Sequence, residues 1–323
     1  MGLTHLESAI GSQPVELERL LTQDLGPFAA RLHGRRRVWL VGTGTSQHAA
    51  EMGALLFAEA GLDARWSGSF EFARIAFKAD SDDAVIVISQ SARTAFAVAA
   101  RQAAIASGAE VLSITGVGGG WPEAIETVAM EQSHTYTVSF TAALMVLCRL
   151  AHELGTDGLS QRELERATAR VRDIVSSTDE LAVELPDRAI VLAGNGAGAI
   201  TAREGALKLR EAARVLAEGY GGEYLLHGHA VPLQAGDTLI LINPTADSDG
   251  LLPSIGKAAQ AEGIVVADLA EPSIDHPVLS QLPLTVRLQM LALRFAKARS
   301  ADPDRAIVGG WDNEALWAIG RPA

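Results

Sequence analysis

The sequence predicts an α/β protein in which two tandem, doubly wound parallel sheets of the flavodoxin-like kind follow a helical segment. Short apolar runs that suit buried strands alternate with longer runs that suit helices. The order of runs then repeats: RVWLVGTGTS, DAVIVISQSART and AEVLSITG resemble RAIVLAGNGAG, DTLILINPTADS and GIVVADLA about 150 residues later. Two copies of one strand–helix pattern, each of typical domain size, indicate an internal duplication.

The expected domain limits follow from this repeat. The best linker candidate is GTDGLS at residues 155–160, because Gly, Asp and Ser interrupt two helical patterns there. We therefore predict a helical N-terminal segment, a first domain, a second domain and a C-terminal tail, over residues 1–33, 34–158, 159–300 and 301–323.

Each expected element rests on its own pattern of apolar residues. Residues 4–33 predict two amphipathic helices, the second starting at Pro14, because Leu17, Leu20 and Leu25 share one face. In the first domain we expect a strand running into a turn over residues 38–46, a helix over 49–61, a short strand at 64–66 and a helix near 70–77. A strand, a Ser-rich turn and a helix are expected over 82–104, a strand over 110–116 and a long helix over 140–154. In the second, a connecting helix is expected over residues 161–179, and strands within 188–198, 237–248 and 263–270.

Composition narrows the class of function. The 323 residues include 27 Lys and Arg against 39 Asp and Glu, so the net charge is −12, which argues against a nucleic-acid partner. No run approaches the roughly 20 apolar residues of a membrane span, and the N-terminus lacks the apolar region of a signal peptide. Cys148 is the only cysteine, so no internal disulfide is expected and the cytoplasm fits.

Three ionisable residues point to proton transfer. Glu204, Lys208 and Glu211 share one face of a predicted helix, because they stand at i, i+4 and i+7. A solvated face with a Glu–Lys pair is the alternative. The glycines of residues 219–222 predict the end of this helix, and His227 follows on a loop. A carboxylate on a helix and a histidine nearby can supply a base and an acid near neutral pH.

A second group of polar residues suits an anion. Ser89, Gln90, Ser91 and Thr94 lie between a predicted strand and the helix that starts near Ala95. A helix N-terminus offers unpaired N–H groups there, so the hydroxyls predict a phosphate cup, although they could simply cap the helix.

The turn after the first strand carries Thr45 and Ser46, where Ser46 could contact a ligand or cap the next helix. The matching turns of the second copy have fewer hydroxyls, which predicts one phosphate site per chain. Gly194–Gly196 is too short a pattern to indicate a dinucleotide, and we expect no cofactor and no metal.

These stretches resemble a known family. The run EGALKLRE, then AEGY and a loop with HG, resembles the catalytic helix and loop of sugar isomerase (SIS) proteins, above all the isomerase half of glucosamine-6-phosphate synthase. The string ISQSART resembles the phosphate loop of that family, with Ala92 and Arg93 in place of Gly and Glu. HTYTVSFT at residues 134–141 resembles a segment that touches phosphate, which makes Thr135 and Thr137 candidates.

The resemblance covers nearly the whole chain and implies a sugar-phosphate substrate. It implies that His227 opens the sugar ring and that Glu211 moves a proton between C1 and C2. Glu204 would lie near the sugar, Lys208 would neutralise developing charge, and Ser46 would contact the sugar. In the family the histidine often comes from the neighbouring subunit, which implies a homodimer with a shared active site.

Three departures from the family pattern limit what the resemblance implies. The chain carries no glutaminase domain with a cysteine nucleophile, so we do not expect synthesis from glutamine. The tail keeps Asp302, Pro303 and Arg305 but has no lysine. His229 stands where the family has proline. This histidine could be a second acid/base or a surface residue.

Isomerase, deaminase and deglycase activity on sugar phosphates all stay open. A sugar-phosphate-sensing regulator is the non-enzymatic alternative. Glu211 together with His227 favours an enzyme.

Overall fold

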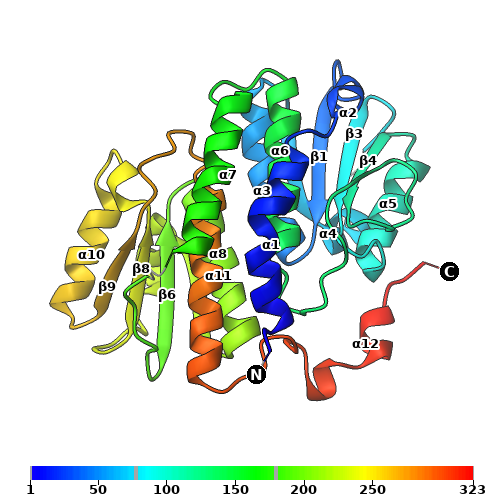
Figure 1. Cartoon of the computed structure of the whole chain (residues 1–323). Coiled ribbons are helices and arrows are strands. Elements are labelled where there is room, and N and C mark those ends of the chain that lie inside the picture. The colour runs from blue at the N-terminus through cyan, green and yellow to red at the C-terminus, as the bar shows by residue number, and fades with distance from the viewer. Residues whose placement is uncertain (1, 76–78, 178–180, 323) are drawn as a thin grey trace. The chain divides into compact units, whose positions relative to one another are not determined.

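The computed structural model describes residues 2–75, 79–177 and 181–322, which contain two parallel sheets with helices packed on them (Figure 1). The α/β class is therefore confirmed. The chain forms two compact units. We call them the first-sheet unit, Ser12–Glu131, Val138–Thr168 and Ile307–Ala323, and the second-sheet unit, which holds the residues up to Gly11, Gln132–Thr137 and Ala169–Ala306.

The first-sheet unit contains five parallel strands in the order β2-β1-β3-β4-β5. The buried residues Trp39 and Val85 pack against Phe72 and Ala100 on one face of this sheet. The strands are β1 Arg37–Gly42, β2 Ala64–Gly68, β3 Asp83–Ile88, β4 Glu110–Thr115 and β5 Ala124–Glu126. The helices are α2 Gly26–Ala30, α3 Thr45–Glu59, α4 Ser69–Arg74, α5 Ala95–Ala106, α6 Val138–Glu153, η3 Gly309–Trp311 and α12 Glu314–Ala318.

The second-sheet unit has four parallel strands in the order β7-β6-β8-β9, which is the order of β2-β1-β3-β4 in the other sheet. Leu192 and Ile240 pack with Leu209 of α8 and Leu288 of α11, whereas α10 covers the other face (Figure 1). The elements are β6 Ala189–Gly194, α8 Ala197–Ala213, β7 Leu216–Gly221, α9 Gly222–Tyr224, η1 Leu225–His229, β8 Thr238–Ile242, η2 Pro244–Ala246, α10 Leu251–Ala261, β9 Val265–Leu269 and α11 Gln281–Ala298.

The N-terminal segment differs from the prediction. One helix, α1 His5–Leu20, runs through Pro14, so the expectation that a helix begins there is wrong. Proline removes one hydrogen bond from a helix interior, and the complete burial of Leu6 and Leu17 on α1 offsets that loss. The predicted helices over residues 70–77 and 161–179 appear as α4 and as α7 Gln161–Ser176, and their last residues lie outside the described part of the chain.

The glycines after α8 also have another role than predicted. The helix ends at Ala213, followed by Arg214 in a left-handed conformation with φ 54°, and residues 216–221 form strand β7. A Cβ on Gly219 would lie 2.4 Å from the carbonyl of Ala202 on α8. Glycine is therefore needed for close helix–strand packing, and the predicted helix stop at residues 219–222 is wrong.

The amino end of α1 is capped by a residue that is remote in sequence. The Asp304 carboxylate accepts hydrogen bonds from the N–H groups of His5 and Leu6, at 2.9 and 2.8 Å. The hydroxyls of Ser133 and Thr135 donate to the carbonyl of Pro303 at 3.2 and 2.8 Å. Three distant stretches of chain thus meet in the second-sheet unit. Within the described residues, no helix has the length and apolar character that crossing a membrane requires.

Candidate functional site

A row of charged residues is buried on α8. The ammonium of Lys208 lies 2.6 Å from Oε2 of Glu211 and 3.4 Å from Oε1 of Glu204. The side chains of Lys208 and Glu204 are 0% exposed, and that of Glu211 is 19% exposed. The solvated-face alternative is therefore wrong. Because charged groups are costly to bury, one ammonium between two carboxylates requires an explanation beyond surface solubility.

The burial of this row follows from how α8 packs. Gly205 faces Leu288 of α11 and Leu192 of β6, and a Cβ on it would lie 2.5 Å from the Leu288 side chain. The helix is thus covered by the sheet on one side and by α11 on another. Of the three charged side chains, only Glu211 keeps partial access to solvent, so it is the carboxylate best placed to meet a ligand.

His227 lies in the short segment that follows β7 and α9. Its imidazole is 74% exposed, and Nε2 lies 4.0 Å from Oε1 of the exposed Glu223. Gly228, with φ 101°, breaks the helical geometry next to it. The three α8 residues therefore come together, whereas the histidine is presented to solvent on a loop.

The departure at His229 has a structural explanation. Its ring stacks on Tyr220 at 4.4 Å and on Tyr224 at 4.5 Å between centroids. Burial, and then the charge of Glu218, raise the pKa of the Tyr220 phenol, so this group stays protonated. The stacking gives His229 a role in ordering the loop that carries His227.

The predicted phosphate cup is a turn in the first-sheet unit. Thr94 is the N-cap residue of α5, but its side chain makes no capping hydrogen bond, which leaves little support for the capping alternative at this residue. Ser89 is buried, and the Ser91 hydroxyl accepts from the N–H of Arg93 at 3.2 Å. Gln90 donates to the carbonyls of residues 128 and 129, so its amide mainly fastens the turn.

Ala92 adopts φ 52°, a left-handed conformation that favours glycine. This is the position at which the resembled phosphate loop has glycine. The chain thus keeps the turn geometry at a cost in backbone strain, and such strain is typical of functional turns.

The C-terminal tail docks beside this turn within the first-sheet unit. Arg321 donates to the carbonyl of Arg93 at 3.3 Å, and Arg74 donates to that of Gly320 at 3.1 Å. Gly320 lies flat against Phe96, since a Cβ there would come within 2.3 Å of the ring. Two guanidinium groups therefore stand near the start of α5, that of Arg321 at the carbonyl of Arg93 and that of Arg74 at 5.8 Å from the centre of the Phe96 ring. The resemblance pointed to a lysine in the tail, whereas the cation that docks beside this turn is Arg321.

The remaining predicted residues are placed as follows. Gly44, with φ 56°, is the N-cap residue of α3, so the alternative that Ser46 caps this helix is wrong. Thr45 is the first residue of α3, and Ser46 is the second. Thr137 is completely buried in the second-sheet unit, and its carbonyl accepts from Gln289 at 3.4 Å. Among the described residues, no group of three or more His, Cys, Asp or Glu could hold a metal ion.

Comparison with known proteins agrees with this architecture. Residues 31–152 match the SIS domain. The chain is 31% identical over 304 residues to glutamine–fructose-6-phosphate aminotransferase [isomerizing] of Thermococcus kodakarensis, covering 83% of this chain and 50% of that protein. It is 30% identical to the protein of that name from Chlorobaculum tepidum, covering 91% of this chain and 54% of that one. The chain thus spans about half the length of the curated relatives it matches.

Solved structures share the fold. The tagatose-6-phosphate ketose/aldose isomerase of Escherichia coli has a TM-score of 0.80 at 16% identity, covering 96% of this chain and 97% of that one. The glucosamine-6-phosphate deaminase of Thermotoga maritima has a TM-score of 0.73 at 16% identity, covering 93% and 97%. The chain therefore carries a SIS domain, and its resemblance to the sugar isomerase family is confirmed.

Proposed function

We propose that this protein is a phosphosugar isomerase or an amino-sugar-phosphate deaminase that moves a proton between C1 and C2 of a sugar phosphate. The buried row of Glu204, Lys208 and Glu211 is the observation that carries this proposal. In the proposed step, the Glu211 carboxylate takes the proton from one carbon, the C–H electron pair forms the C1–C2 double bond, and the carbonyl oxygen takes a proton from solvent as its π bond breaks. The same carboxylate then returns its proton to the neighbouring carbon, while the hydroxyl on the first carbon loses its proton to solvent and becomes the new carbonyl.

Lys208 would stabilise negative charge that develops on the substrate oxygen. Its side chain is completely buried, and a positive charge acts more strongly on an oxyanion where water is excluded. Glu204 would hold that ammonium in place and lie close to the sugar. His227 would open the ring by moving a proton between the anomeric hydroxyl and the ring oxygen, because an imidazole can both accept and donate a proton.

We propose that the phosphate binds at the turn of Ser89, Gln90, Ser91 and Thr94. The uncapped start of α5 and the guanidinium groups near it support this assignment, because both favour an anion. Thr45 and Ser46 would contact the sugar. The complete burial of Thr137 gives it less support as a phosphate contact than the turn has.

The proposed arrangement is a pair of tandem SIS-type domains over residues 34–158 and 159–300, with a helical segment before them and a tail after them. The shared strand order of the two sheets supports it. We further propose a homodimer in which His227 acts in the partner's site. Support comes from the exposed apolar side chains of Tyr224, Leu226 and Val231 around that histidine, which a partner would cover.

Proton exchange at C2 in deuterated water, measured by NMR on a panel of sugar phosphates, tests the activity. Glu211→Gln should lower exchange at least about 10²-fold while sugar-phosphate binding persists, and the exposed Glu262→Gln serves as the matched control. Full exchange in Glu211→Gln would refute the assignment. Binding of sugar phosphates to the unmodified protein without exchange would indicate a sensor, and ammonia or amino-acid release would identify a deaminase or a deglycase.

The shared site can be tested by mixing two inactive variants. Glu211→Gln and His227→Ala chains, unfolded and refolded together, should regain about a quarter of the normal activity, because half the dimers are mixed and each mixed dimer has one intact site. Each variant refolded alone gives the baseline. No recovery in a mixture that forms mixed dimers would show that each site uses its own histidine.

A further inference from the structure

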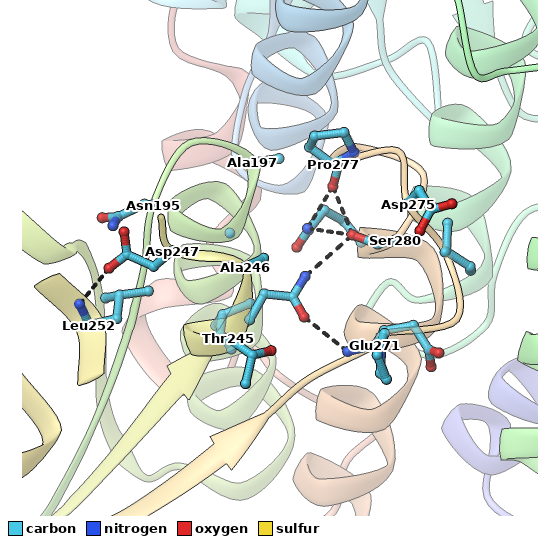
Figure 2. A pocket seen from close by; sticks show the side chains of 16 residues that line it. Asn195, Ala197, Thr245, Ala246, Asp247, Leu252, Glu271, Asp275, Pro277 and Ser280 are labelled. Carbon is cyan, nitrogen blue, oxygen red and sulfur yellow. Dashed lines mark hydrogen bonds between the residues drawn. The ribbon is translucent and has the colours of Figure 1, made fainter. Parts of the chain in front are cut away.

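The second-sheet unit contains a pocket that the proposed activity does not use. It encloses about 380 Å³, within the range of small-molecule sites. Its walls come from the turn after β6, the start of α8, and the segments that follow β8 and β9 (Figure 2). This is the carboxyl end of a parallel sheet, beside the point where the strand order reverses from β6-β7 to β6-β8, and ligands bind at such points in open α/β sheets.

The pocket is separate from the charged row of α8. Gly198 lines the pocket and precedes Lys208 by ten positions on one continuous helix. At a rise of about 1.5 Å per residue, the two lie roughly 15 Å apart along the axis. A ligand in the pocket would therefore be bound at the opposite end of α8 from Glu211.

Hydrogen bonds hold the polar wall of the pocket in a fixed geometry. Asn243, with φ 50°, accepts from the N–H of Glu271 at 2.9 Å and donates to the Ser280 hydroxyl at 3.4 Å. The Gln281 amide donates to the carbonyl of Pro277 at 2.7 Å. Ser280, Gln281 and Glu271 are all buried. Such a rigid polar wall in a pocket suits the recognition of a polar ligand.

One buried acceptor in this wall has no donor. Oε1 of Gln281 makes no hydrogen bond among the described residues, and a buried acceptor without a donor destabilises the fold. Gln281 lines the pocket, so a ligand that brings hydroxyl or amine donors could relieve this cost.

The charge of the lining argues against phosphate. Asp247, Glu271 and Asp275 line the pocket, and its lining includes no Lys or Arg. Glu271 is already paired with Arg170 at 2.8 Å, and Asp247 accepts from the N–H of Leu252 at 2.6 Å through one oxygen. The second oxygen of Asp247 and the exposed carboxylate of Asp275 can accept from a ligand, and Figure 2 shows the two residues on different sides of the pocket.

We propose that this pocket is a second ligand site, for a sugar or amino sugar that carries no phosphate. Its hydroxyl and ammonium groups would donate to the two aspartates and to the side-chain amides. Such groups match a wall of carboxylates and amides, whereas a phosphate would be repelled by it. The site would discriminate against phosphate, and the Ser89–Thr94 turn would select for it.

Pocket-filling substitution tests the site. Thr245 is an exposed lining residue, so Thr245→Trp fills the pocket without disturbing the core, and Thr245→Ser is its matched control. Glucose and glucosamine are the probes, observed by saturation-transfer NMR, and inorganic phosphate is the competitor. We expect saturable binding of at least one probe near about 1 mM, lost in Thr245→Trp, kept in Thr245→Ser and unaffected by phosphate. Absence of binding, or binding that Thr245→Trp leaves unchanged or phosphate displaces, would overturn the proposal.

Charge removal tests the ligand class. Asp275→Asn should weaken glucosamine binding at least about tenfold, whereas replacement of the exposed Asp249, which does not line the pocket, by Asn should leave binding unchanged. An equal loss of glucosamine binding in both variants would mean that the overall negative charge attracts the amine, and it would contradict a specific site at the pocket. A Ser91→Ala variant separates this site from the proposed phosphate turn, because probe binding at the pocket should survive it.

Discussion

Replacement of Lys208 by methionine is expected to destabilise the protein strongly. Methionine preserves the length and most of the volume of the side chain but removes its charge. The ammonium lies 3.4 Å from Glu204 and 2.6 Å from Glu211. At an effective dielectric constant near 20, these pairs are worth roughly 5 and roughly 6 kcal/mol before the cost of burying the ammonium is subtracted. Breaking a buried ion pair by removing one partner typically costs about 3–5 kcal/mol, which we expect here.

Urea unfolding, followed by tryptophan fluorescence and far-UV circular dichroism, measures this loss. A typical domain is stable by about 5–15 kcal/mol, so the variant should remain folded enough to measure. The exposed Lys257 on α10 offers the matched control, and Lys257→Met should change stability by less than about 0.5 kcal/mol.

A double variant sharpens the result. Glu204→Gln with Lys208→Met removes both members of the fully buried pair, so it should be more stable than Lys208→Met alone. A loss below about 1 kcal/mol in Lys208→Met would refute the reasoning, because it would mean that the carboxylates do not depend on that ammonium.

Three further predictions concern the two units separately. Gly219→Ala should cost about 1–3 kcal/mol in urea unfolding, because its Cβ would meet the α8 backbone at 2.4 Å, whereas Gly221→Ala, whose nearest contact is at 3.9 Å, should be nearly neutral; equal effects would contradict the packing argument. Burial raises the pKa of Glu123, but hydrogen bonds, first that from Arg101, outweigh it and hold the pKa below its ordinary value. The Glu123–Arg101 pair therefore stabilises the fold above the unfolded pKa of about 4.3, and this stability is lost as pH falls through the lower pKa of the folded state. Glu123→Gln should remove that part of the loss of stability in acid. Urea midpoints of the unmodified protein that do not change between about pH 5 and pH 3 would contradict this. Burial raises the pKa of the Cys148 thiol, so a thiol reagent at pH 8 should label it only as the chain unfolds, and rapid labelling of the native protein would show that the helix opens.

The central strands of both sheets could be predicted from the sequence because they are continuous apolar runs buried on both faces. β7 could not, since LAEGYG contains two glycines, a glutamate and little apolar surface. It is a strand because it pairs with β6 and because Gly219 allows α8 to lie against it. β5, with three residues, is too short to leave a pattern.

The site was predictable to a similar degree. The spacing of Glu204, Lys208 and Glu211 predicts that they share one face of a helix. Whether this face is buried depends on how α11 and the sheet pack against α8, which the spacing does not show. The stacking of His229 between two tyrosines depends on a loop conformation that periodicity does not encode. Arg321 is brought to the turn of Ser89–Thr94 by tail docking over more than two hundred residues, and no local pattern could indicate that.

The carboxylate cap on α1 has a consequence for how the protein is made. His5 and Asp304 are separated by 299 positions, so on the ribosome the first end of α1 emerges long before its cap. At about 5–20 residues per second, translation would keep this helix end waiting for roughly 15–60 s. During that interval the first N–H groups of α1 have no carboxylate acceptor, and the second-sheet unit can complete this contact only after Asp304 has been synthesised.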